Sequence, residues 1–590
     1  MNFASPVAGD IRSTWKTGAL FLVVLMALTC LAYSPGAGNT FIWDDDDYVV
    51  ENRNLRTFDG LLAIWLHPHS LPQYYPMVHT TFWVEYQLWG AAPLGYHQIN
   101  IVLHALNAFL IWLLLRRLGV PWAWLAAAIF AVHPVHVESV AWITERKNVL
   151  SLFFCLAAAL LFLKSVRFGR DEAVRNSHKV LYSLSLICFV LALLSKTVTA
   201  VLPAALLVII WWKHDLRLKR DWPVFLLLAP FLLAGLALGL VTVQLELQHV
   251  GAFGADWDYG LVSRILIAGR ALWFYLGKLV WPHPLVFFYE RWEISPTSLW
   301  QHLFPFSFIV VLLVLWFYRN RLGRGPLAAL LIYSGALFPA LGFFNVFPHR
   351  YSFVADHFQY LASIPAIALL VAALARIVTW LGRTRLPSHQ VAWLRGMTAL
   401  CLLAPLVWLT IRQVPVYANE VTLWQDTIAK NPSSWAAHHN LGNHYKRNGQ
   451  FDQAWRHFEQ AIQLRPHHER AYLCLAEILE MQGRWEEAEV HYRIAARYGA
   501  DDISILLRVG NFFIRRDQPD KAMAFYLGIL EREPGNYYAN LNAGHVYMLR
   551  ADFTSAERYY RRAVAADPAS EPAGEYLRRA IQAQGRPPSD

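Results

Sequence analysis

The sequence is poor in charged residues and in cysteine. Asp, Glu, Lys and Arg make up only 16% of its 590 residues while 56% are hydrophobic, whereas ordinary soluble domains carry about a quarter charged residues. So little polar surface predicts that much of the chain lies in a membrane. The five cysteines show no CxxC or other paired spacing, so neither a disulfide framework nor a zinc site is indicated.

Several familiar catalytic motifs are missing as well. The chain has no GxxxxGK[ST] loop, no GxSxG and no HExxH, which removes support for P-loop NTPases, serine hydrolases and zinc proteases of those kinds. Its net charge of +10 does not indicate nucleic acid as a partner, because Lys and Arg occur in short clusters between apolar segments. That pattern is typical of the cytoplasmic loops of membrane proteins.

Apolar segments dominate the first 412 residues. The first, 17–34, predicts an uncleaved signal-anchor helix with a cytoplasmic N-terminus. Segment 265–281 carries Arg270 and Lys278, and if it lies on the outer interface, every basic loop is cytoplasmic and eleven crossings remain. The acidic run Asp44–Asp47 and the chain after residue 412 are then extracytoplasmic. The other apolar segments are 98–118, 121–133, 147–164, 179–195, 197–212, 222–243, 302–318, 326–344, 357–381 and 392–411.

A 34-residue repeat fills the C-terminal part of the chain. Its recurring positions hold Leu441, Leu475, Val509 and Ala543, then Gly442, Ala476, Gly510 and Gly544, and later Phe458, Tyr492, Tyr526 and Tyr560. This is the tetratricopeptide pattern, in which small residues lie where two helices touch and aromatic residues fill the space between them. Concave arrays of this kind bind peptides or partner helices and do no chemistry.

The repeats and the apolar segments together predict an all-α fold class. We expect a polytopic membrane domain over 1–412 and a connecting helix or linker over 413–434. Four tetratricopeptide repeats follow over 435–570, and a capping helix with a disordered tail occupies 571–590.

Four adjacent carboxylates, Asp44–Asp47, follow the first apolar segment. Like charges this close repel, so at least one of their pKa values should be raised unless a cation, a substrate or solvent compensates. Such a run is either a hydrated loop or a site for a general base or a metal at the membrane rim. The run alone leaves both interpretations open.

A polar stripe follows on the next apolar helix. His97, Asn100 and His104 recur at spacings of three and four, which places them on one helix face. Polar side chains in a membrane helix face protein or a water-filled cavity. The stripe therefore serves either substrate binding or hydrogen bonding between helices.

Two further clusters lie on the same predicted face. His133, His136 and Glu138 are candidate metal ligands, although the proline between the two histidines spoils a regular helical presentation. The basic residues that follow suit a phosphate, since Arg offers a bidentate fork and Lys a point charge. These are Arg146, Lys147 and Lys196, and a late outer loop adds Arg350 and Asp356. Acids beside such cations at the lipid edge suggest group transfer from a lipid phosphate.

Several longer motifs recur in an order typical of one family. They are Phe41-Ile42-Trp43-Asp44-Asp45 with Asn52, Tyr75-Pro76, Gly95-Tyr96-His97-Gln98-Ile99-Asn100 with His104 and Asn107, His133-Pro134-Val135-His136-Val137-Glu138-Ser139-Val140, Leu194-Ser195-Lys196 and Ala355-Asp356-His357. With the membrane-then-repeat order, these motifs resemble the transmembrane and tetratricopeptide-repeat O-mannosyltransferases of the GT-C glycosyltransferase superfamily. The resemblance covers nearly the whole chain.

The resemblance implies an inverting enzyme that moves a sugar, mannose in the eukaryotic members, from a polyprenyl-phosphate donor to a hydroxyl acceptor. The acceptor would be a Ser or Thr of a protein recruited by the repeats. The chain looks like a bacterial relative, so the donor lipid would be undecaprenyl phosphate. The protein would then lie in the inner (cytoplasmic) membrane, with its repeats on the periplasmic side.

The resemblance also implies the residues of the site. The acidic pair corresponds to Asp44 and Asp45 as catalytic residues. The residues expected to bind the donor phosphate or substrate are Arg146, Lys147, Lys196, Arg350, His97, Asn100, His104, His133, His136, Glu138 and Asp356. A divalent cation could assist, but the sequence offers no convincing ligand set, and no other cofactor is expected.

The chain departs from the family pattern in two places. The acidic pair is extended to four, and the usual Ser-Lys-Glu reads Ser195-Lys196-Thr197, which removes one acid near the expected phosphate site. Two other functions compete: a non-enzymatic membrane-anchored repeat scaffold for envelope complexes, and a transporter of the same lipid. An anchor needs only one or two helices and no costly polar stripes, and a transporter should show paired Gly/Pro-interrupted segments at the midplane. We therefore favour the enzyme.

Overall fold

The computed structural model describes residues 11–71, 73–167, 175–176, 178–214, 216, 218–245, 254–385, 387–568 and 570–585. This part of the chain is helical, apart from a two-residue antiparallel pair formed by β1 (Val166–Arg167) and β2 (Arg175–Asn176). The predicted all-α fold class is confirmed. The last residues of the expected C-terminal tail, 586–590, lie outside the described residues. The chain divides into two compact units, Met1–Pro432 and Ser433–Asp590.

Seven helices in the described part of the first unit are long and apolar enough to cross a membrane. They are α1 (Ile11–Tyr33), α4 (Pro93–Arg117), α7 (Arg146–Ser165), α11 (Pro223–Leu245), α13 (Leu299–Phe317), α16 (Ser363–Arg385) and α17 (Ser388–Gln413). An eighth candidate span is bent by 53° between Ala123–Val132, which is α5, and Pro134–Ala141. The chain is therefore a multi-pass membrane protein.

Three shorter apolar helices account for the rest of the eleven expected crossings. They lie at Lys179–Ser195, Thr197–Lys213 and Gly325–Ala340, and contain α8 (Lys179–Ser195), α9 (Leu202–Lys213) and α15 (Gly325–Leu337). Each is shorter than the roughly 20 residues that a straight span needs. By length and composition the described residues contain seven or eight spans, and the three shorter helices occupy the other three segments for which crossings were expected.

Helix α12 (Leu261–Val280), which covers most of segment 265–281, is not among these candidate spans. Its basic side chains are engaged at its surface: Arg264 donates hydrogen bonds to the carbonyl oxygens of Tyr259 and Gly342 (2.9 and 2.6 Å), and Arg270 lies over the ring of Trp292. An amphipathic helix of this kind suits a membrane interface.

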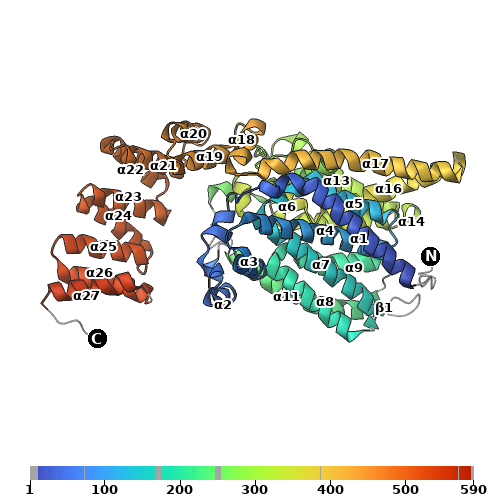
Figure 1. Cartoon of the computed structure of the whole chain (residues 1–590), viewed down its shortest axis with the longest axis horizontal. Helices are drawn as coiled ribbons and strands as arrows, with labels where there is room; N and C mark the ends of the chain where they lie inside the picture. Colours follow the sequence, from blue (N-terminus) through green and yellow to red (C-terminus); the bar gives the residue numbers. More distant parts are fainter. Residues whose placement is uncertain are drawn as a thin grey trace. The chain divides into compact units, whose positions relative to one another are not determined.

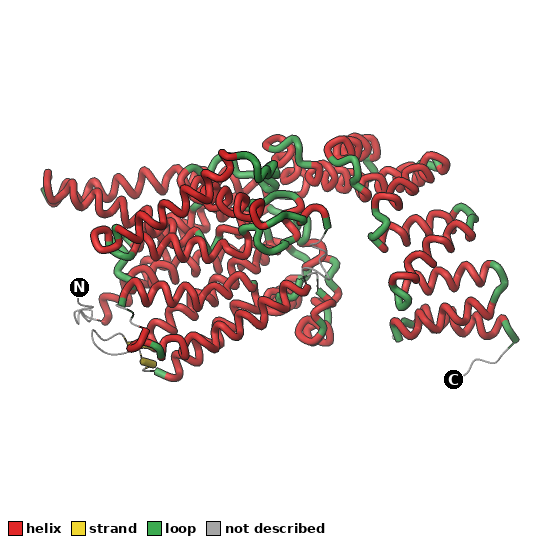
Figure 2. Tube along the Cα trace, turned by 180° about the vertical axis from the view of Figure 1, so that it is seen from behind, coloured by secondary structure: helices red, strands yellow, loops and turns green. Residues whose placement is uncertain are grey.

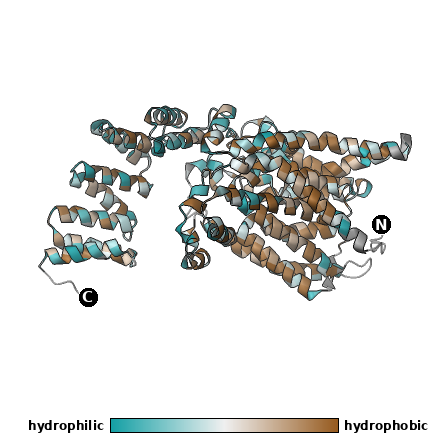
Figure 3. Ribbon diagram, in the orientation of Figure 1, coloured by the Kyte–Doolittle hydropathy of each residue, from teal (hydrophilic) through white to brown (hydrophobic). Residues whose placement is uncertain are grey.

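The centre of the first unit is formed by α4 and α7. Half of the apolar window of α4 and two-thirds of that of α7 are buried, compared with 22% for α1 and 11% for α13. The outer helices expose Leu, Val and Phe side chains, as lipid-facing helices do. Figure 3 shows this hydrophobic bundle, and Figure 2 shows that most irregular segments of the unit gather at the end away from the N-terminus.

Four segments far apart in sequence meet at that end. The backbone N–H of Thr40 donates to the carbonyl oxygen of Ala418 (2.8 Å). Helix α18 (Glu420–Lys430) follows the short turn Val414–Tyr417, and Lys430 Nζ donates to the carbonyl oxygen of Leu285 (2.9 Å). The segment expected as a connection, 413–434, thus packs mostly within the first unit. Two short helices, α2 (Phe58–Leu66) and α3 (Pro76–Trp89), complete this end (Figure 1).

The second unit is a series of antiparallel helix pairs. The pairs are α19 (Trp435–Arg447) with α20 (Phe451–Leu464), α21 (Glu469–Met481) with α22 (Trp485–Tyr498), α23 (Ile503–Arg515) with α24 (Pro519–Arg532), and α25 (Tyr537–Leu549) with α26 (Phe553–Ala566), followed by α27 (Glu571–Ala583). The glycine positions explain the repeat. A Cβ on Gly510 would lie 2.5 Å from the Tyr526 ring, and one on Gly544 2.5 Å from the Tyr560 ring. Only very small residues let each pair close over its aromatic partner.

Candidate functional site

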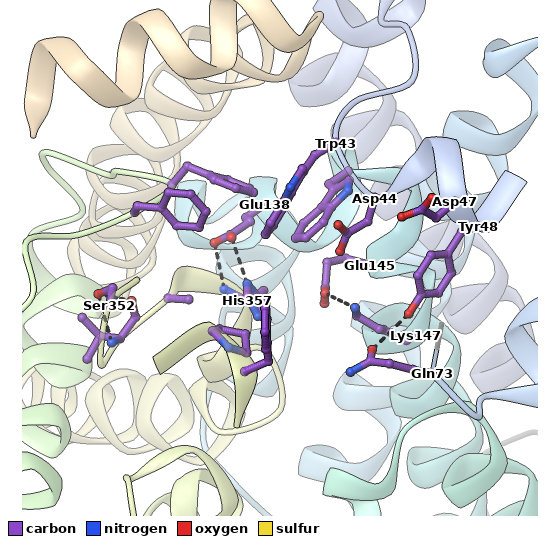
Figure 4. A pocket seen from close by; sticks show the side chains of 17 residues that line it. Trp43, Asp44, Asp47, Tyr48, Gln73, Glu138, Glu145, Lys147, Ser352 and His357 are labelled. Carbon is purple, nitrogen blue, oxygen red and sulfur yellow. Dashed lines mark hydrogen bonds and ion pairs between the residues drawn. The ribbon is translucent and has the colours of Figure 1, made fainter. Parts of the chain in front are cut away.

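A cavity of about 190 Å³ lies among the loops at the end of the first unit. Its walls come from the acidic run, the start of α7, and two later loops. Its lining includes Trp43, Asp44, Asp47, Tyr48, Gln73, Glu138, Trp142, Glu145, Lys147, Phe287, Phe288, Phe347, Pro348, Ser352, Val354, Ala355 and His357. Figure 4 shows acidic, basic and aromatic side chains converging on this space. Of the residues that the sequence predicts for the site, Asp44, Glu138 and Lys147 line this cavity.

Neighbouring residues of the acidic run Asp44–Asp47 have different surroundings. Asp44 lines the cavity, as does Asp47, whereas Asp45 is fully buried beneath the loop. The carboxylate of Asp45 accepts hydrogen bonds from the backbone N–H of Ile42 (3.0 Å) and from the N–H and hydroxyl of Thr144 (2.8 and 2.5 Å). Asp45 thus fastens the loop to the residues just before α7, and Asp44 is left to face the cavity.

The environment of the run raises several carboxyl pKa values, as the sequence predicted. Burial raises the pKa of Asp44 to about 6, and the nearby charge of Lys147 opposes that rise. Burial also raises the pKa of Asp45 to about 7, against hydrogen bonds that favour its charged form. The pKa of Asp47, an exposed residue, is raised by partial loss of solvent and by its acidic neighbour Glu51. Asp44 consequently titrates close to neutral pH inside the cavity.

Trp43 sets the direction of the acids that follow it. Its backbone has φ of 47°, a left-handed conformation that is a genuine outlier for a bulky residue and costs on the order of 1–3 kcal/mol. The indole is held by aromatic neighbours: it stacks on Trp142 (5.4 Å between centroids) and meets Phe288 and Trp424 edge to face (5.5 and 5.9 Å). This packing stabilises the strained turn and gives the cavity an aromatic wall.

One lysine faces the cavity and a second supports it. Lys147 Nζ lies 3.0 Å from Glu145 Oε1 and over the rings of Trp142 and Tyr48. Lys196 Nζ lies 3.4 Å from the other oxygen of Glu145 and donates to Asn148 Oδ1 (2.8 Å). Two cations therefore share one buried carboxylate, which leaves this cluster with an excess of positive charge beside Asp44.

Arg146 does not face the cavity, contrary to the expected phosphate-binding role. Its guanidinium is fully buried and bonds to the carboxylate of Glu85, the side chains of Asn100 and Thr81, and the carbonyl oxygen of Tyr96. All of its N–H groups are thereby directed into the protein, and none is directed toward a ligand. Arg146 ties α7 to α3 and α4 instead.

The polar stripe on α4 also bonds within the protein. Asn100 Nδ2 donates to the carbonyl oxygen of Trp142 (3.3 Å). His104 bonds through Nδ1 to the hydroxyl of Tyr360 (2.7 Å) and through Nε2 to the carbonyl oxygen of Ala131 (3.1 Å). His97 is buried on the same helix. None of the three lines the cavity described above. The bonds of Asn100 and His104 serve helix packing, one of the two alternatives left open by the sequence, whereas the role of His97 stays a prediction.

The three candidate metal ligands, His133, His136 and Glu138, do not all face the cavity. His133 Nε2 lies 3.0 Å from the carbonyl oxygen of Leu279, and His136 bonds to the carbonyl oxygen of Phe130 and the hydroxyl of Ser363. Of the three, Glu138 alone lines the cavity. No group of three or more His, Cys, Asp or Glu side chains in the described part of the chain is arranged to hold a metal ion.

The two remaining expected residues lie behind the cavity wall. Arg350 Nε is 3.3 Å from Asp256 Oδ2, in an ion pair next to the lining residues Phe347 and Pro348. Asp356 accepts hydrogen bonds from the hydroxyl of Tyr289 (3.0 and 3.1 Å), and burial raises its pKa well above the usual range. Both therefore shape the loop that bounds the cavity.

Sequence reasoning missed His357 as a site residue. The imidazole Nδ1 lies 2.8 Å from Glu138 Oε1, and its backbone N–H donates to Glu138 Oε2 (3.0 Å) (Figure 4). The two residues are 219 positions apart in sequence. The motif Ala355-Asp356-His357 was the signal that could have identified it, but nothing local links that motif to Glu138.

The chain is similar to known proteins both in its repeats and over most of its length. Models of the tetratricopeptide repeat match residues 445–506 and 537–570, which confirms the repeats. Over about three-quarters of the chain, "Protein O-mannosyl-transferase F38B6.6" of Caenorhabditis elegans is 26% identical over 468 residues, covering 76% of this chain and 63% of that protein.

Two human proteins are similar too. "Protein O-mannosyl-transferase TMTC1" is 24% identical over 506 residues, which is 76% of this chain and 55% of the relative, and "Protein O-mannosyl-transferase TMTC4" is 32% identical over 27% of this chain and 25% of its own length. The chain thus spans between a quarter and about two-thirds of these relatives. The predicted resemblance to O-mannosyltransferases with tetratricopeptide repeats is confirmed as a similarity over about three-quarters of the chain, while the GT-C class and a bacterial origin stay predictions.

Proposed function

We propose that this protein is an integral-membrane glycosyltransferase that moves a sugar from a polyprenyl-phosphate donor to a Ser or Thr hydroxyl of an acceptor protein. The observation that supports it most is Asp44, a partly buried carboxylate facing a cavity that also contains Lys147 and an aromatic wall. The names of the similar proteins favour mannose as the sugar.

Asp44 is the proposed general base. A base works best when its pKa lies near the operating pH, and burial brings the pKa of Asp44 to about 6. Its carboxylate takes the proton of the acceptor hydroxyl as the oxygen attacks the anomeric carbon. The bond between that carbon and the phosphate oxygen breaks, and its electron pair stays on the lipid phosphate. A single base and a direct displacement give inversion at the anomeric carbon.

Asp45 is proposed as a positioning residue. Its carboxylate has three hydrogen bonds within the loop and to Thr144, so it has no free direction toward an acceptor. Fixing the Asp44 backbone to the residues just before α7 holds the base within reach of the reacting atoms, because small displacements of a catalytic group cost large factors in rate.

Lys147 and Lys196 are proposed to stabilise the developing charge on the leaving phosphate. Cations placed beforehand at the site where charge develops act strongly in a cavity that excludes water. Glu145 holds both amines, so they need little reorganisation when the donor binds. The aromatic wall of Trp43, Trp142 and Phe288 offers a flat apolar surface for the sugar ring or the first isoprene unit.

The repeats are proposed to recruit the acceptor protein. A hollow of about 480 Å³ in the second unit is lined by polar and charged side chains, with Glu477, Tyr492, Arg508, Asn511 and Arg515 among them. Solenoid hollows of this kind present an extended surface to partner chains. We place the repeats on the extracytoplasmic side of a bacterial inner membrane, with undecaprenyl phosphate as the donor lipid.

The test measures consumption of a polyprenyl-phosphate-sugar by the purified full chain. Asp44→Asn should lower the rate by about 10²–10⁴, the usual contribution of a general base. Asp59→Asn, which changes an exposed carboxylate in the first turn of α2, is the matched control and should keep the wild-type rate. Equal donor consumption by wild type and Asp44→Asn would refute Asp44 as the base, and no donor consumption by wild type would leave the membrane-anchored repeat scaffold as the better account.

A further inference from the structure

The Glu138–His357 pair forms a second polar group on the cavity wall, separate from the acidic run. Both side chains line the cavity, and Figure 4 shows them to one side of Trp43, with Asp44 and Lys147 to the other. Two bonds fix the histidine to the carboxylate, one through Nδ1 (2.8 Å) and one through its backbone N–H (3.0 Å). The proposed base and lysines do not use this pair.

The geometry directs one ring nitrogen away from the protein framework. A carboxylate accepts, so Nδ1 carries the proton that it donates to Glu138. The carbonyl oxygen of His357 accepts from Asn148 Nδ2 (3.0 Å), and the ring packs edge to face on Phe358 and Trp142. With backbone and ring fixed, Nε2 is the remaining nitrogen, and it belongs to a residue of the cavity wall.

We propose that His357, oriented by Glu138, is a binding residue for the phosphate of the lipid donor, to which its protonated Nε2 donates a hydrogen bond. This inference rests on the proposed glycosyltransferase function. It gives His357, in the loop Phe353–Tyr360, a contact with the same phosphate that Lys147 and Lys196 are proposed to stabilise. The ligand class is a polyprenyl phosphate, as the sugar-bearing diester before transfer and the monoester after it.

The chemistry of the step fits this assignment. When the sugar leaves, negative charge grows on the phosphate oxygen that was bonded to the anomeric carbon. An imidazolium N–H donor to that oxygen makes a charge-assisted hydrogen bond, about twice as strong as a neutral one. No proton needs to leave the imidazole: the acceptor proton goes to Asp44, and the electron pair of the broken bond stays on the phosphate.

Charged groups of both signs surround the imidazole of His357. Glu138 is in direct contact, and Asp44 and Glu145 act on the same space through their charges. Lys147 and Lys196 are the opposing cations, both held by Glu145, and Asp356 precedes His357 in the chain. Charges of both signs thus face the imidazole, and Glu138 is the one in direct contact with it.

The test measures equilibrium binding of farnesyl phosphate to the purified full chain between pH 5.5 and 8.5, with farnesol measuring the contribution of the tail. The phosphate has its own second ionisation at about pH 6. The affinity of each variant for farnesyl phosphate is therefore divided by the affinity of wild type at the same pH. His357→Gln should weaken binding about tenfold at pH 5.5 and less than twofold at pH 8.5, because only the protonated imidazole makes the charge-assisted bond.

A second variant separates this role from a merely structural one. Glu138→Gln keeps an acceptor for Nδ1–H, loses the acceptor for the backbone N–H of His357 and removes the negative charge, so the midpoint of the His357-dependent binding should move to lower pH. A purely structural contact would not shift that midpoint. His67→Gln, an exposed histidine of the same unit, is the control and should bind as wild type does.

Some outcomes would overturn the proposal, and they differ from those that test the enzyme. A constant affinity ratio for His357→Gln across the pH range, or no farnesyl phosphate binding by wild type, refutes the phosphate contact. If the His357-dependent binding is present and Asp44→Asn preserves it, but no sugar is transferred, the glycosyltransferase function fails while the phosphate site stands.

Discussion

Replacing Lys147 with methionine tests the electrostatic link between the cavity lysine and the proposed base. Burial raises the pKa of Asp44 to about 6, and Lys147 is the largest influence that lowers it. Asp44 acts as a base only when ionised, so activity should fall as the pH drops through that value. With a midpoint at about 6, the ionised fraction is roughly one-tenth at pH 5 and nine-tenths at pH 7, which predicts a tenfold rise in kcat/KM.

Removing the lysine should move this acidic limb to higher pH. An opposite charge a few ångströms away lowers a carboxyl pKa by about one unit or more, so Lys147→Met should place the midpoint near about 7. At pH 6 the ionised fraction would then fall from about one-half to about one-tenth, a fivefold loss in addition to any weaker hold on the phosphate. Methionine keeps the length of the apolar stem, so packing over Trp142 and Tyr48 is largely retained.

The assay is donor consumption by the purified chain, with kcat/KM measured between pH 4.5 and 8. Lys196→Met is the matched control, because Lys196 pairs with the same Glu145 but does not line the cavity. That variant should lower the rate without moving the midpoint. If Lys147→Met leaves the midpoint where it was, the limb does not report Asp44 and the assignment of the base is refuted.

Two further predictions concern the framework. Arg146→Gln should lower the stability of the first unit by about 3–5 kcal/mol, because Glu85 is left buried without its cation; thermal unfolding in detergent measures this, and unchanged stability with a raised donor KM would return Arg146 to the phosphate site. Gly544→Ala should destabilise the repeats by about 1–3 kcal/mol, since the new Cβ meets the Tyr560 ring. The control Gly528→Ala, with nothing within 4 Å, should stabilise them slightly. Protease cleavage of the full chain within 433–590 reports both glycine variants, and equal rates would contradict the packing argument.

The fold was largely predictable because its determinants are local. Long apolar segments and basic clusters indicate membrane helices whatever their neighbours are, and a 34-residue period places small residues and aromatics at fixed offsets. Span number was less predictable, because α8, α9 and α15 are apolar but short, and composition cannot show how a short helix is placed. The alternatives left open for the α4 stripe were also decided only by packing.

The sequence by itself determined that this is a helical membrane protein with tetratricopeptide repeats, and that Asp44–Asp47 is its most unusual polar feature. It could not distinguish Asp44 from Asp45, because neighbours in a run carry the same chemistry. Tertiary structure decides that choice: the left-handed turn at Trp43 and hydrogen bonds from Thr144, 99 residues away, bury one carboxylate and present the other.

Tertiary structure also gives two adjacent cations different partners and brings two distant residues into contact. Arg146 and Lys147 differ by about 100° around the axis of α7, so one points to Glu85 in the protein interior and the other into the cavity. Glu138 and His357 lie 219 positions apart and meet in one hydrogen-bonded pair. Composition and period belong to the chain, whereas the direction of a side chain and the partner it meets exist only once the helices have packed.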